Sequence, residues 1–232
     1  MPREAPVAGL VGLFPAFVAQ YSVAFDPHTD ADLALRFPGI EVPESLARAV
    51  PKRRVEYCAG RFCAQQALRV CSAADAQTVI GTGAHGEPLW PAGIVGAITH
   101  THEFAAAAVA LKRDARAIGF DAERVTQLSA DVLDYIAVPA EIAALSLTSN
   151  MDADVVASVV FSAKESLFKC LYPEVQRYFD FRDAVIEALD SRGHFRARLL
   201  VELTAQLPQG SRFTGRFANA DGRVYTAIVL EP

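Results

Sequence analysis

The sequence lacks a long apolar run, an excess of positive charge and any paired-cysteine motif. No segment reaches the roughly 20 consecutive apolar residues that a membrane-spanning helix needs, so we expect no stable membrane insertion. The formal net charge of −5 counts against broad electrostatic binding to nucleic acid or to an anionic membrane surface. The four cysteines form no C-x-x-C pair, and their apolar neighbours indicate reduced, mostly buried thiols in a cytoplasmic protein.

Lysine is also scarce, since the chain has 4 lysines against 18 arginines. Each lysine is therefore worth noticing, and Lys164 and Lys169 fall within one short stretch. What is present is ordinary globular material: 232 residues, of which 52% are hydrophobic and 21% charged. That length allows one large domain or two small lobes.

The first residues raise the question of a signal peptide. Residues 5–19 are mostly apolar and follow Arg3. Glu4, beside the only early basic residue, and Pro15, inside the apolar run, disfavour a secretion signal. We therefore expect a cytoplasmic protein.

Two long amphipathic patterns predict the main helices. In residues 53–70 and again in 154–171, apolar side chains recur every three or four positions. A shorter helix is predicted from Glu44, and Pro51 either kinks it or opens a second helix at its first turn.

The ends of the second helical region are less regular. Residues 128–150 are predicted to form a helix from Ser129, followed by a mobile, weakly patterned segment. Pro173 is expected to end the long helix of residues 154–171, and a strand-rich tail is predicted to begin at 179–181.

Short antiparallel strands are predicted around these helices. The alanine run 105–108 favours helix by propensity, but the short loops on both sides leave little room for one, so we predict strand. Three neighbouring segments are expected to form a three-stranded meander: 94–100, 103–111 and 117–123. The remaining predicted strands are 20–25, a hairpin within 194–203, and a hairpin of 213–217 with 224–230.

Each half of the chain would then hold a long helix and a small antiparallel sheet. We therefore predict an α+β fold of two similar lobes, residues 1–115 and 116–232, with the strand 118–123 at their junction. The sequence identity between the halves is negligible, so this repeat rests on the pattern of elements.

A pair of acidic residues lies on that strand, in Ile118-Gly119-Phe120-Asp121-Ala122-Glu123. Because side chains alternate faces along a strand, Asp121 and Glu123 would point the same way, and Phe120 and Ala122 would face the core. Two carboxylates on one face repel each other unless a cation lies between them, and a hard divalent cation is the usual one. A polar strand edge that runs into a turn is the alternative.

Three charged residues lie midway along the second long helix: Lys164, Glu165 and Lys169. Charges in a largely apolar helix need partners. Ser162 and Glu165 match a capping box, but the apolar period starts upstream of Ser162, which weakens that interpretation. Glu165 and Lys169 also match a stabilising i,i+4 pair, which is compatible with a functional role.

Two further features could bind an anion. Arg54 and Arg61 are seven residues apart on one helix face, where a solvated basic face is the alternative. His100 lies in Thr99-His100-Thr101-His102, and H-x-H can bind zinc, but no other Cys or His has matching spacing. Contact of His100 with a phosphate is the better functional interpretation. The alternative is that His100 only occupies a turn and has no functional role.

Taken together, these pieces resemble the 4′-phosphopantetheinyl transferases, and among them the monomeric two-lobed class of the enterobactin synthetase component D type. Four blocks carry the resemblance, in the family's order and spacing and over most of the chain. They are RRVEYCAGRFCAQQAL at 53–68, PLWPAGIVGAITH at 88–100, IGFDAE at 118–123 and FSAKESLFK at 161–169.

Some positions depart from the family pattern. The acidic strand usually reads G-[IV]-D-[IVL]-E, so Phe120 and Ala122 are unusual occupants of its apolar positions. Thr99 stands where many members have serine, which keeps the hydroxyl. Glu87 lies in a loop where some relatives carry a basic residue, which leaves one phosphate contact open.

The resemblance implies two lobes related by a pseudo-two-fold axis, with coenzyme A in the cleft between them. It implies transfer of the phosphopantetheine arm to a serine of an apo acyl or peptidyl carrier protein, with release of adenosine 3′,5′-bisphosphate. By motif position, Asp121, Glu123 and Glu165 would hold Mg²⁺, and Lys169 would contact the pyrophosphate.

Further contacts follow from the same motif positions. His100 after Thr99, with Arg54 or Arg61, would bind the 3′-phosphate and adenosine end of coenzyme A, and Lys164 would be a secondary contact or an orienting residue. The attacking serine must lose a proton, and Glu165 or a metal-bound water is the candidate base. Spacing leaves both open.

Two other functions are compatible with parts of the pattern. A Mg²⁺-dependent nuclease could use D-x-E with a helical Lys-Glu, but the acidic net charge and the absence of a basic groove count against it. A non-catalytic module that binds coenzyme A or a carrier protein would be expected to have lost a carboxylate, and all three are present. Two lobes in one chain make a monomer sufficient, and siderophore biosynthesis or other secondary metabolism is the expected setting.

Overall fold

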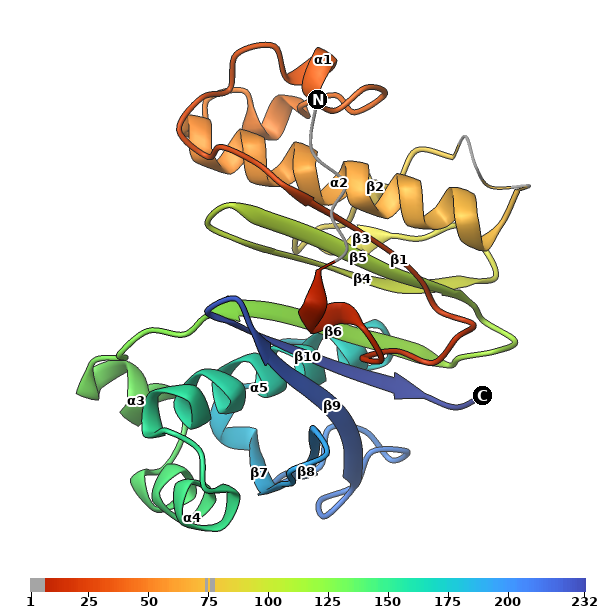
Figure 1. Cartoon of the computed structure of the whole chain (residues 1–232). Helices are drawn as coiled ribbons and strands as arrows, with labels where there is room; N and C mark the ends of the chain where they lie inside the picture. Colours follow the sequence, from red (N-terminus) through yellow and green to blue (C-terminus); the bar gives the residue numbers. More distant parts are fainter. Residues whose placement is uncertain (1–6, 74, 76–77) are drawn as a thin grey trace. The chain divides into compact units, whose positions relative to one another are not determined.

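The computed structural model describes residues 7–73, 75 and 78–232. The chain forms two compact units, residues 15–118 with 231–232, and residues 8–14 with 119–230. Each unit packs an antiparallel sheet against one long helix, so the predicted α+β class is confirmed. Figure 1 labels the elements along the chain.

The first unit holds a three-stranded sheet of order β1-β5-β4, and helix α2 packs against all three strands. The alanine run 105–108 is strand, as predicted, because β5 is the central strand and pairs with a neighbour on each side. Pro51 is the first residue of α2, where its missing N–H costs nothing. The main elements are α2 (Pro51–Cys71), β1 (Ala19–Ala24), β4 (Ile94–Thr101) and β5 (Phe104–Leu111), and the shorter ones are α1 (Leu33–Arg36), η2 (Glu44–Leu46), β2 (Gly81–Thr82) and β3 (Pro88–Leu89).

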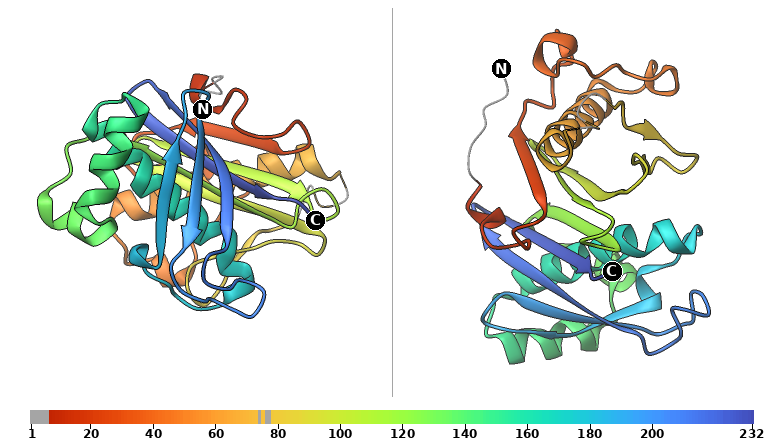
Figure 2. Two further views of the ribbon diagram at one scale, coloured as in Figure 1. Left: turned by 90° about the horizontal axis from the view of Figure 1, so that it is seen from below. Right: turned by 90° about the vertical axis from the view of Figure 1, so that its right-hand side faces the viewer.

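The second unit holds a five-stranded sheet of order β6-β10-β9-β8-β7. Figure 2 shows α5 lying along one face of this sheet. The other face is packed by η1, and the ring of Phe14 meets Phe120 edge-on with 5.1 Å between centroids. The elements are η1 (Ala8–Leu10), β6 (Ala117–Arg124), α3 (Ala130–Ile136), α4 (Pro139–Ser149), α5 (Ala153–Val175), η3 (Phe181–Asp183), β7 (Ala184–Leu189), β8 (His194–Leu199), β9 (Arg212–Ala220) and β10 (Arg223–Leu230).

The predicted meander of three consecutive strands is wrong. β4 and β5 pair as expected, but β6 lies beside β10 in the second sheet, and the third strand of the first sheet is β1. β1 pairs with β5 from Ala19 opposite Val109 to Ala24 opposite Phe104. The alternation in residues 20–25 is too weak to name a partner, so sequence order alone suggested the wrong neighbour.

The prediction of a mobile segment before residue 150 is also wrong, because a second helix, α4, occupies it. α4 buries Glu141 and Leu145, one turn apart, on its inward side. A charged residue at a buried position hides the apolar period from which a helix is predicted.

Two smaller boundaries differ from prediction. Pro173 lies inside α5, which continues to Val175 and ends at Gln176, whose backbone is left-handed with φ 53°. Residues 179–181 lead into the short helix η3, and the first strand of the tail begins only at Ala184.

No single helix of the described residues is long and apolar enough to cross a membrane, and the bent pair α3 with α4 reaches that measure only in combination and only by length and composition.

β6 and α5 approach each other so closely that one position between them requires glycine. A Cβ added at Gly119 would collide with the backbone oxygen of Ser166 and would lie 2.8 Å from Cβ of Cys170. The Gly119→Ala substitution is therefore expected to destabilise the second unit by about 3 kcal/mol, the upper end of the usual cost of overpacking. Urea denaturation followed by circular dichroism measures this change.

Gly81 provides a matched control in a strand. An added Cβ there would meet only Leu89, at an ordinary contact distance of 3.5 Å. Gly81→Ala should stay within about 0.5 kcal/mol of the wild type. Equal denaturation curves for the two variants would contradict the close contact at Gly119.

Candidate functional site

The acidic strand β6 turns its carboxylates toward helix α5. Oδ1 of Asp121 accepts a hydrogen bond from Nζ of Lys169 at 2.6 Å, and Oδ2 accepts one from Oγ of Ser162 at 2.9 Å. Phe120 and Ala122, which alternate with the acids, are fully buried, as predicted. The acids therefore face the helix, and the apolar pair packs on the opposite face of the sheet.

A buried network of three hydroxyl groups is hydrogen-bonded to Asp121 through Ser162. Oγ of Ser162 lies 2.9 Å from Oγ1 of Thr226, which in turn lies 2.7 Å from Oγ of Ser166. Ser166 also donates to the backbone oxygen of Thr226 at 2.9 Å, and all three hydroxyl residues are fully buried. The network holds Asp121 in one orientation, because each hydroxyl can both donate and accept.

The sequence missed this network. The capping box that Ser162 matches in the sequence is not formed, because α5 begins at Ala153 with Asp152 as its N-cap. Thr226 lies in β10, 60 residues further along the chain than Ser166, and no sequence signal connects the two.

The charges of three carboxylates and one lysine act on one another here. Burial, then the charge of Asp121 and that of Glu165, raise the pKa of Glu123 to about 8, although Lys169 opposes this. Burial and Asp121 likewise raise the pKa of Glu165. Burial lowers the pKa of Lys169, but the attraction of Asp121, Glu165 and Glu123 outweighs it, so the pKa of Lys169 lies above its ordinary value. Lys169 is the counter-charge of the cluster.

The donor chemistry of this acidic cluster, Asp121, Glu123 and Glu165, fits a hard divalent cation. Carboxylate oxygens are the ligands that Mg²⁺ prefers, and three acids around one lysine leave an excess of negative charge. In the part of the chain that the structure describes, no three His, Cys, Asp or Glu side chains are arranged as a ready metal shell. Lys169 instead engages Oδ1 of Asp121.

Lys164 has a different partner from its neighbours in the motif. Its Nζ donates to Oε2 of Glu141 at 3.0 Å and to the backbone oxygen of Ile136 at 2.8 Å, and both charged side chains are 3% exposed. Oε1 of Glu141 accepts from the backbone N–H of Ile186 at 2.8 Å. Burial lowers the pKa of Lys164, although Glu141 opposes that change. The buried pair ties α3, α4 and β7 to α5.

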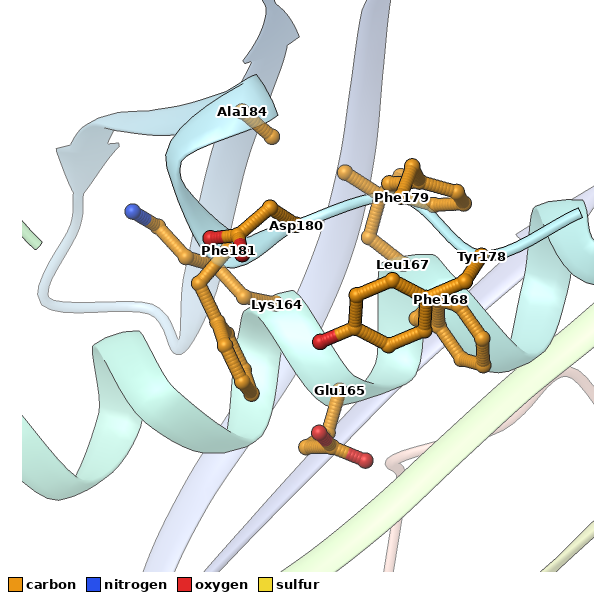
Figure 3. A pocket seen from close by; sticks show the side chains of 9 residues that line it. All are labelled: Lys164, Glu165, Leu167, Phe168, Tyr178, Phe179, Asp180, Phe181 and Ala184. Atoms are coloured by element: carbon orange, nitrogen blue, oxygen red, sulfur yellow. The ribbon is translucent and has the colours of Figure 1, made fainter. Parts of the chain in front are cut away.

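An aromatic pocket of the second unit opens beside Glu165, as Figure 3 shows. The ring of Phe168 packs on Phe179 at 5.0 Å and on Tyr178 at 5.6 Å between centroids, and Phe161 packs on Phe181 at 5.4 Å. The pocket therefore combines one carboxylate from the acidic cluster with aromatic walls. Its lining residues are Lys164, Glu165, Leu167, Phe168, Tyr178, Phe179, Asp180, Phe181 and Ala184.

The two arginines singled out in the first unit have separate partners. Arg54 bonds to Oδ2 of Asp30 through Nε at 2.7 Å and through Nη2, and Nη1 donates to the backbone oxygen of Ala49 at 2.6 Å. Arg61 is 5% exposed, its guanidinium lies over the ring of Tyr57, and its Nη2 donates to Oγ1 of Thr82 at 2.8 Å. Nη1 of Arg61 has no hydrogen-bond partner among the described residues. A buried guanidinium N–H that has no partner can donate a hydrogen bond to an acceptor atom of a ligand.

His100 lies near the exposed start of α2. Its Nε2 is 3.3 Å from Nη1 of Arg53, and its Nδ1 is 3.9 Å from Oε2 of Glu56. Thr99, beside it, is buried. The predicted anion contacts, Arg54 and Arg61, do not include Arg53, which is the arginine that lies beside His100.

Comparison with known proteins assigns both units to the same family. Residues 42–110 match the 4′-phosphopantetheinyl transferase N-terminal domain, and residues 117–218 match the 4′-phosphopantetheinyl transferase superfamily. The chain is 38% identical over 211 residues to the 4′-phosphopantetheinyl transferase Svp of Streptomyces mobaraensis, which covers 89% of this chain and 83% of that protein. It is 35% identical over 231 residues to the 4′-phosphopantetheinyl transferase PptT of Mycobacterium tuberculosis, which covers 95% of this chain and 99% of that protein. Enterobactin synthase component D of Salmonella typhimurium is more distant, at 30% identity over 186 residues, 80% of this chain and 75% of that protein.

The buried ion pair of Lys164 and Glu141 generates a prediction about stability. Lys164→Met leaves the Glu141 carboxylate buried without its counter-charge, which is expected to cost about 3–5 kcal/mol of unfolding free energy. The double variant Lys164→Met with Glu141→Gln removes both charges and should recover part of that loss. Urea denaturation of the single and double variants gives the coupling energy.

A surface pair provides the matched control. Lys52 and Glu56 are 3.7 Å apart at i,i+4, and the Lys52 side chain is 54% exposed, so Lys52→Met should cost less than about 1 kcal/mol. If the losses at Lys164 and Glu141 simply add in the double variant, the two residues do not stabilise each other.

Proposed function

The chain belongs to the 4′-phosphopantetheinyl transferase superfamily, and we propose that it transfers the 4′-phosphopantetheine arm of coenzyme A to a serine of an apo carrier protein. Adenosine 3′,5′-bisphosphate is the proposed leaving product. The family membership confirms the resemblance that the four sequence blocks carried. The observation that supports the detailed proposal is the cluster of Asp121, Glu123, Glu165 and Lys169, because phosphoryl transfer depends on charge neutralisation and positioning more than on covalent help from the protein.

The acidic cluster would hold Mg²⁺ through Asp121, Glu123 and Glu165. When bound there, Mg²⁺ would supply charge neutralisation at the pyrophosphate of coenzyme A. Lys169 already carries the positive charge of the cluster and is 27% exposed, so it can also offset the charge that develops on the leaving bisphosphate. Ser162 and Thr226 keep the Asp121 carboxylate oriented while this occurs.

Glu165 is the proposed proton acceptor for the attacking serine hydroxyl. It is the member of the acidic cluster that also lines the aromatic pocket, so it faces both the phosphate chemistry and a space that a substrate can enter. A general base must lie within hydrogen-bond reach of the proton that it takes. Glu165 lies between the acidic cluster and the aromatic pocket, so it would meet this requirement when both substrates are bound.

The aromatic pocket is the proposed site of the pantetheine arm. The arm is long, uncharged and partly apolar, and ligand sites for such groups are lined mainly by aromatic and apolar side chains with a few polar groups. Phe168, Phe179 and Phe181 supply those walls, and Glu165 marks the end at which the reacting phosphate would lie.

In the first unit, we propose Arg61 rather than Arg54 for the 3′-phosphate, with His100 and Arg53 as further contacts. The unpaired Nη1 of Arg61 supports this choice, because a charge-assisted hydrogen bond to a phosphate would satisfy it. Arg54 is already engaged by Asp30. Lys164 is proposed as a positioning residue, since its ammonium is held by Glu141.

Glu165→Ala is expected to reduce transfer by at least about 100-fold, because it removes a carboxylate that acts where charge develops. The protein should stay folded, since the substitution also relieves repulsion within the cluster. The measurement is the covalent mass increase of an apo carrier protein incubated with coenzyme A and Mg²⁺. Glu174→Ala, on the exposed end of the same helix, is the control, and full activity of Glu165→Ala would rule out this assignment.

Arg61→Ala is expected to lose the discrimination between coenzyme A and 3′-dephospho-coenzyme A. A hydrogen bond to a charged group contributes about 1.5–3 kcal/mol, which corresponds to a change in the affinity ratio of about tenfold or more. Isothermal titration with both ligands measures the ratio. Arg54→Ala should keep the discrimination, and the opposite result for the two arginines would assign the phosphate to Arg54.

A further inference from the structure

The five-stranded sheet of the second unit exposes part of one face to solvent. α5 packs on one side of this sheet, and η1 packs on the other side against β9 and β10. The left view of Figure 2 looks onto that other side, where β7, β8 and β9 lie in front of α5. Side chains alternate between the two sides: in β8, Phe195, Ala197 and Leu199 are buried, whereas Arg196 between them is exposed.

Four arginines gather on this outward side of β8 and β9. Arg198 lies directly opposite Arg212 across the two strands, Arg196 is two residues from Arg198, and Arg216 is four residues from Arg212. Side chains two or four residues apart on a strand, or directly opposite on its neighbour, share one face. The side chains of Arg196 and Arg212 are 54% and 61% exposed. We call these four side chains the arginine face.

One carboxylate, that of Glu187 in β7, contacts the arginine face. Its Oε1 accepts a hydrogen bond from Nε of Arg198 at 2.5 Å, and its Oε2 lies 3.1 Å from Nε of Arg212 and 3.4 Å from Nε of Arg196. Arg216 has no ion pair among the residues that the structure describes. Four positive charges against one negative charge leave a local excess of three, on a chain whose net charge is −5.

This excess leaves binding capacity for an external anion. The contacts with Glu187 use the Nε atoms, so in the described part of the chain the Nη groups of Arg196, Arg198 and Arg212 remain available to another acceptor. Like charges directly opposite each other on neighbouring strands are destabilising, and an added carboxylate relieves that repulsion. A guanidinium also binds a carboxylate through paired N–H groups, which makes the contact directional.

The surroundings of the arginine face indicate the kind of anion. The neighbouring outward positions hold His194 and Thr214 rather than the Phe, Tyr or Trp on which bases of a single-stranded nucleic acid would stack. The negative net charge of the chain disfavours duplex nucleic acid and an anionic membrane surface. These features favour a compact acidic surface of another protein.

Spacing favours a helix as that acidic surface. Carboxylates at i and i+4 of a helix have Cβ atoms about 5–6 Å apart, close to the roughly 6.6 Å between side chains two residues apart on a strand. A helix also bonds its own backbone, so it can lie flat on a sheet face, whereas an extended chain pairs at a sheet edge.

We propose that the arginine face docks an acidic helix of a partner protein. The arginine face lies on the side of the sheet away from α5, which carries Glu165, so the helix that binds there is not the segment that presents the reacting serine. The proposal therefore goes beyond the proposed function and does not depend on it.

The test measures binding of a fluorescent acidic peptide to the full chain by anisotropy. The probe is a stapled, alanine-rich peptide of about 20 residues, long enough to be helical, with glutamates at four-residue spacing. Arg196→Gln with Arg216→Gln is expected to weaken binding about tenfold, because each exposed ion pair contributes up to a few-fold in affinity. Arg48→Gln with Arg113→Gln removes the same charge from exposed positions of the first unit and should change binding by less than about twofold.

A second variant separates docking from a purely structural role of the arginines. Glu187→Gln removes the carboxylate that competes with the peptide for three of the arginines, so binding should tighten about threefold. Glu44→Gln makes the same charge change at an exposed position of the first unit and should leave the affinity unchanged. Thermal melting of each variant checks that the fold is retained.

Three results would overturn the proposal. One is equal affinity of the wild type and the double arginine variant for the glutamate peptide. Another is equal binding of a peptide in which every glutamate is replaced by glutamine. The third is arginine-dependent binding of a single-stranded oligonucleotide or of phosphatidylserine vesicles that is tighter than binding of the glutamate peptide, since that would assign the arginine face to phosphates. None of these measurements involves transfer, so they leave the proposed function standing or falling on its own assay.

Discussion

The second unit depends on the contact between β6 and α5. Gly119 allows the backbones to approach, and Asp121 then reaches both Lys169 and Ser162 on the helix. A carboxylate that is 3% exposed is tolerated only because each oxygen has a hydrogen-bond partner. The same contact brings Glu165 and Glu123 within electrostatic range of Asp121, so the packing that builds the fold also concentrates negative charge at the proposed site.

Buried charge also organises the surroundings of the site. The pair of Lys164 and Glu141 is buried, and each group has one further hydrogen bond, from Lys164 to the backbone oxygen of Ile136 and from the backbone N–H of Ile186 to Glu141. A buried ion pair is weak evidence for stability, since desolvation opposes the attraction between the charges. Its clearer consequence is geometric: it fixes where α3 and α4 lie relative to α5. Lys164 and Lys169, five residues apart, thus have different partners, which are Glu141 for Lys164 and Asp121 for Lys169.

The first unit shows how residue type and surroundings together set a role. Arg54 and Arg61 lie on one helix and look equivalent by spacing. Asp30, from the loop before α1, engages the guanidinium of Arg54, whereas Arg61 is held against Tyr57 and Thr82 with one N–H unpaired. An arginine whose N–H donors already bond to a carboxylate has few left for a phosphate. A buried arginine with an unused N–H can donate that hydrogen bond to a phosphate oxygen.

Local pattern determined a large part of this protein from sequence alone. The two long helices, the last hairpin, the alternation that buries Phe120 and Ala122, and the four motif blocks of the family all depend on residues close together in the chain, where periodicity and spacing are informative. Tertiary structure alone decided the partner of β1, the existence of α4, the hydroxyl network behind Asp121 and the engagement of Lys164 by Glu141. Each of these joins residues more than 20 positions apart, or places a polar side chain where an apolar one is expected. Sequence periodicity reports burial of apolar groups, whereas a buried charge or hydroxyl is explained only by the partner that the fold brings to it.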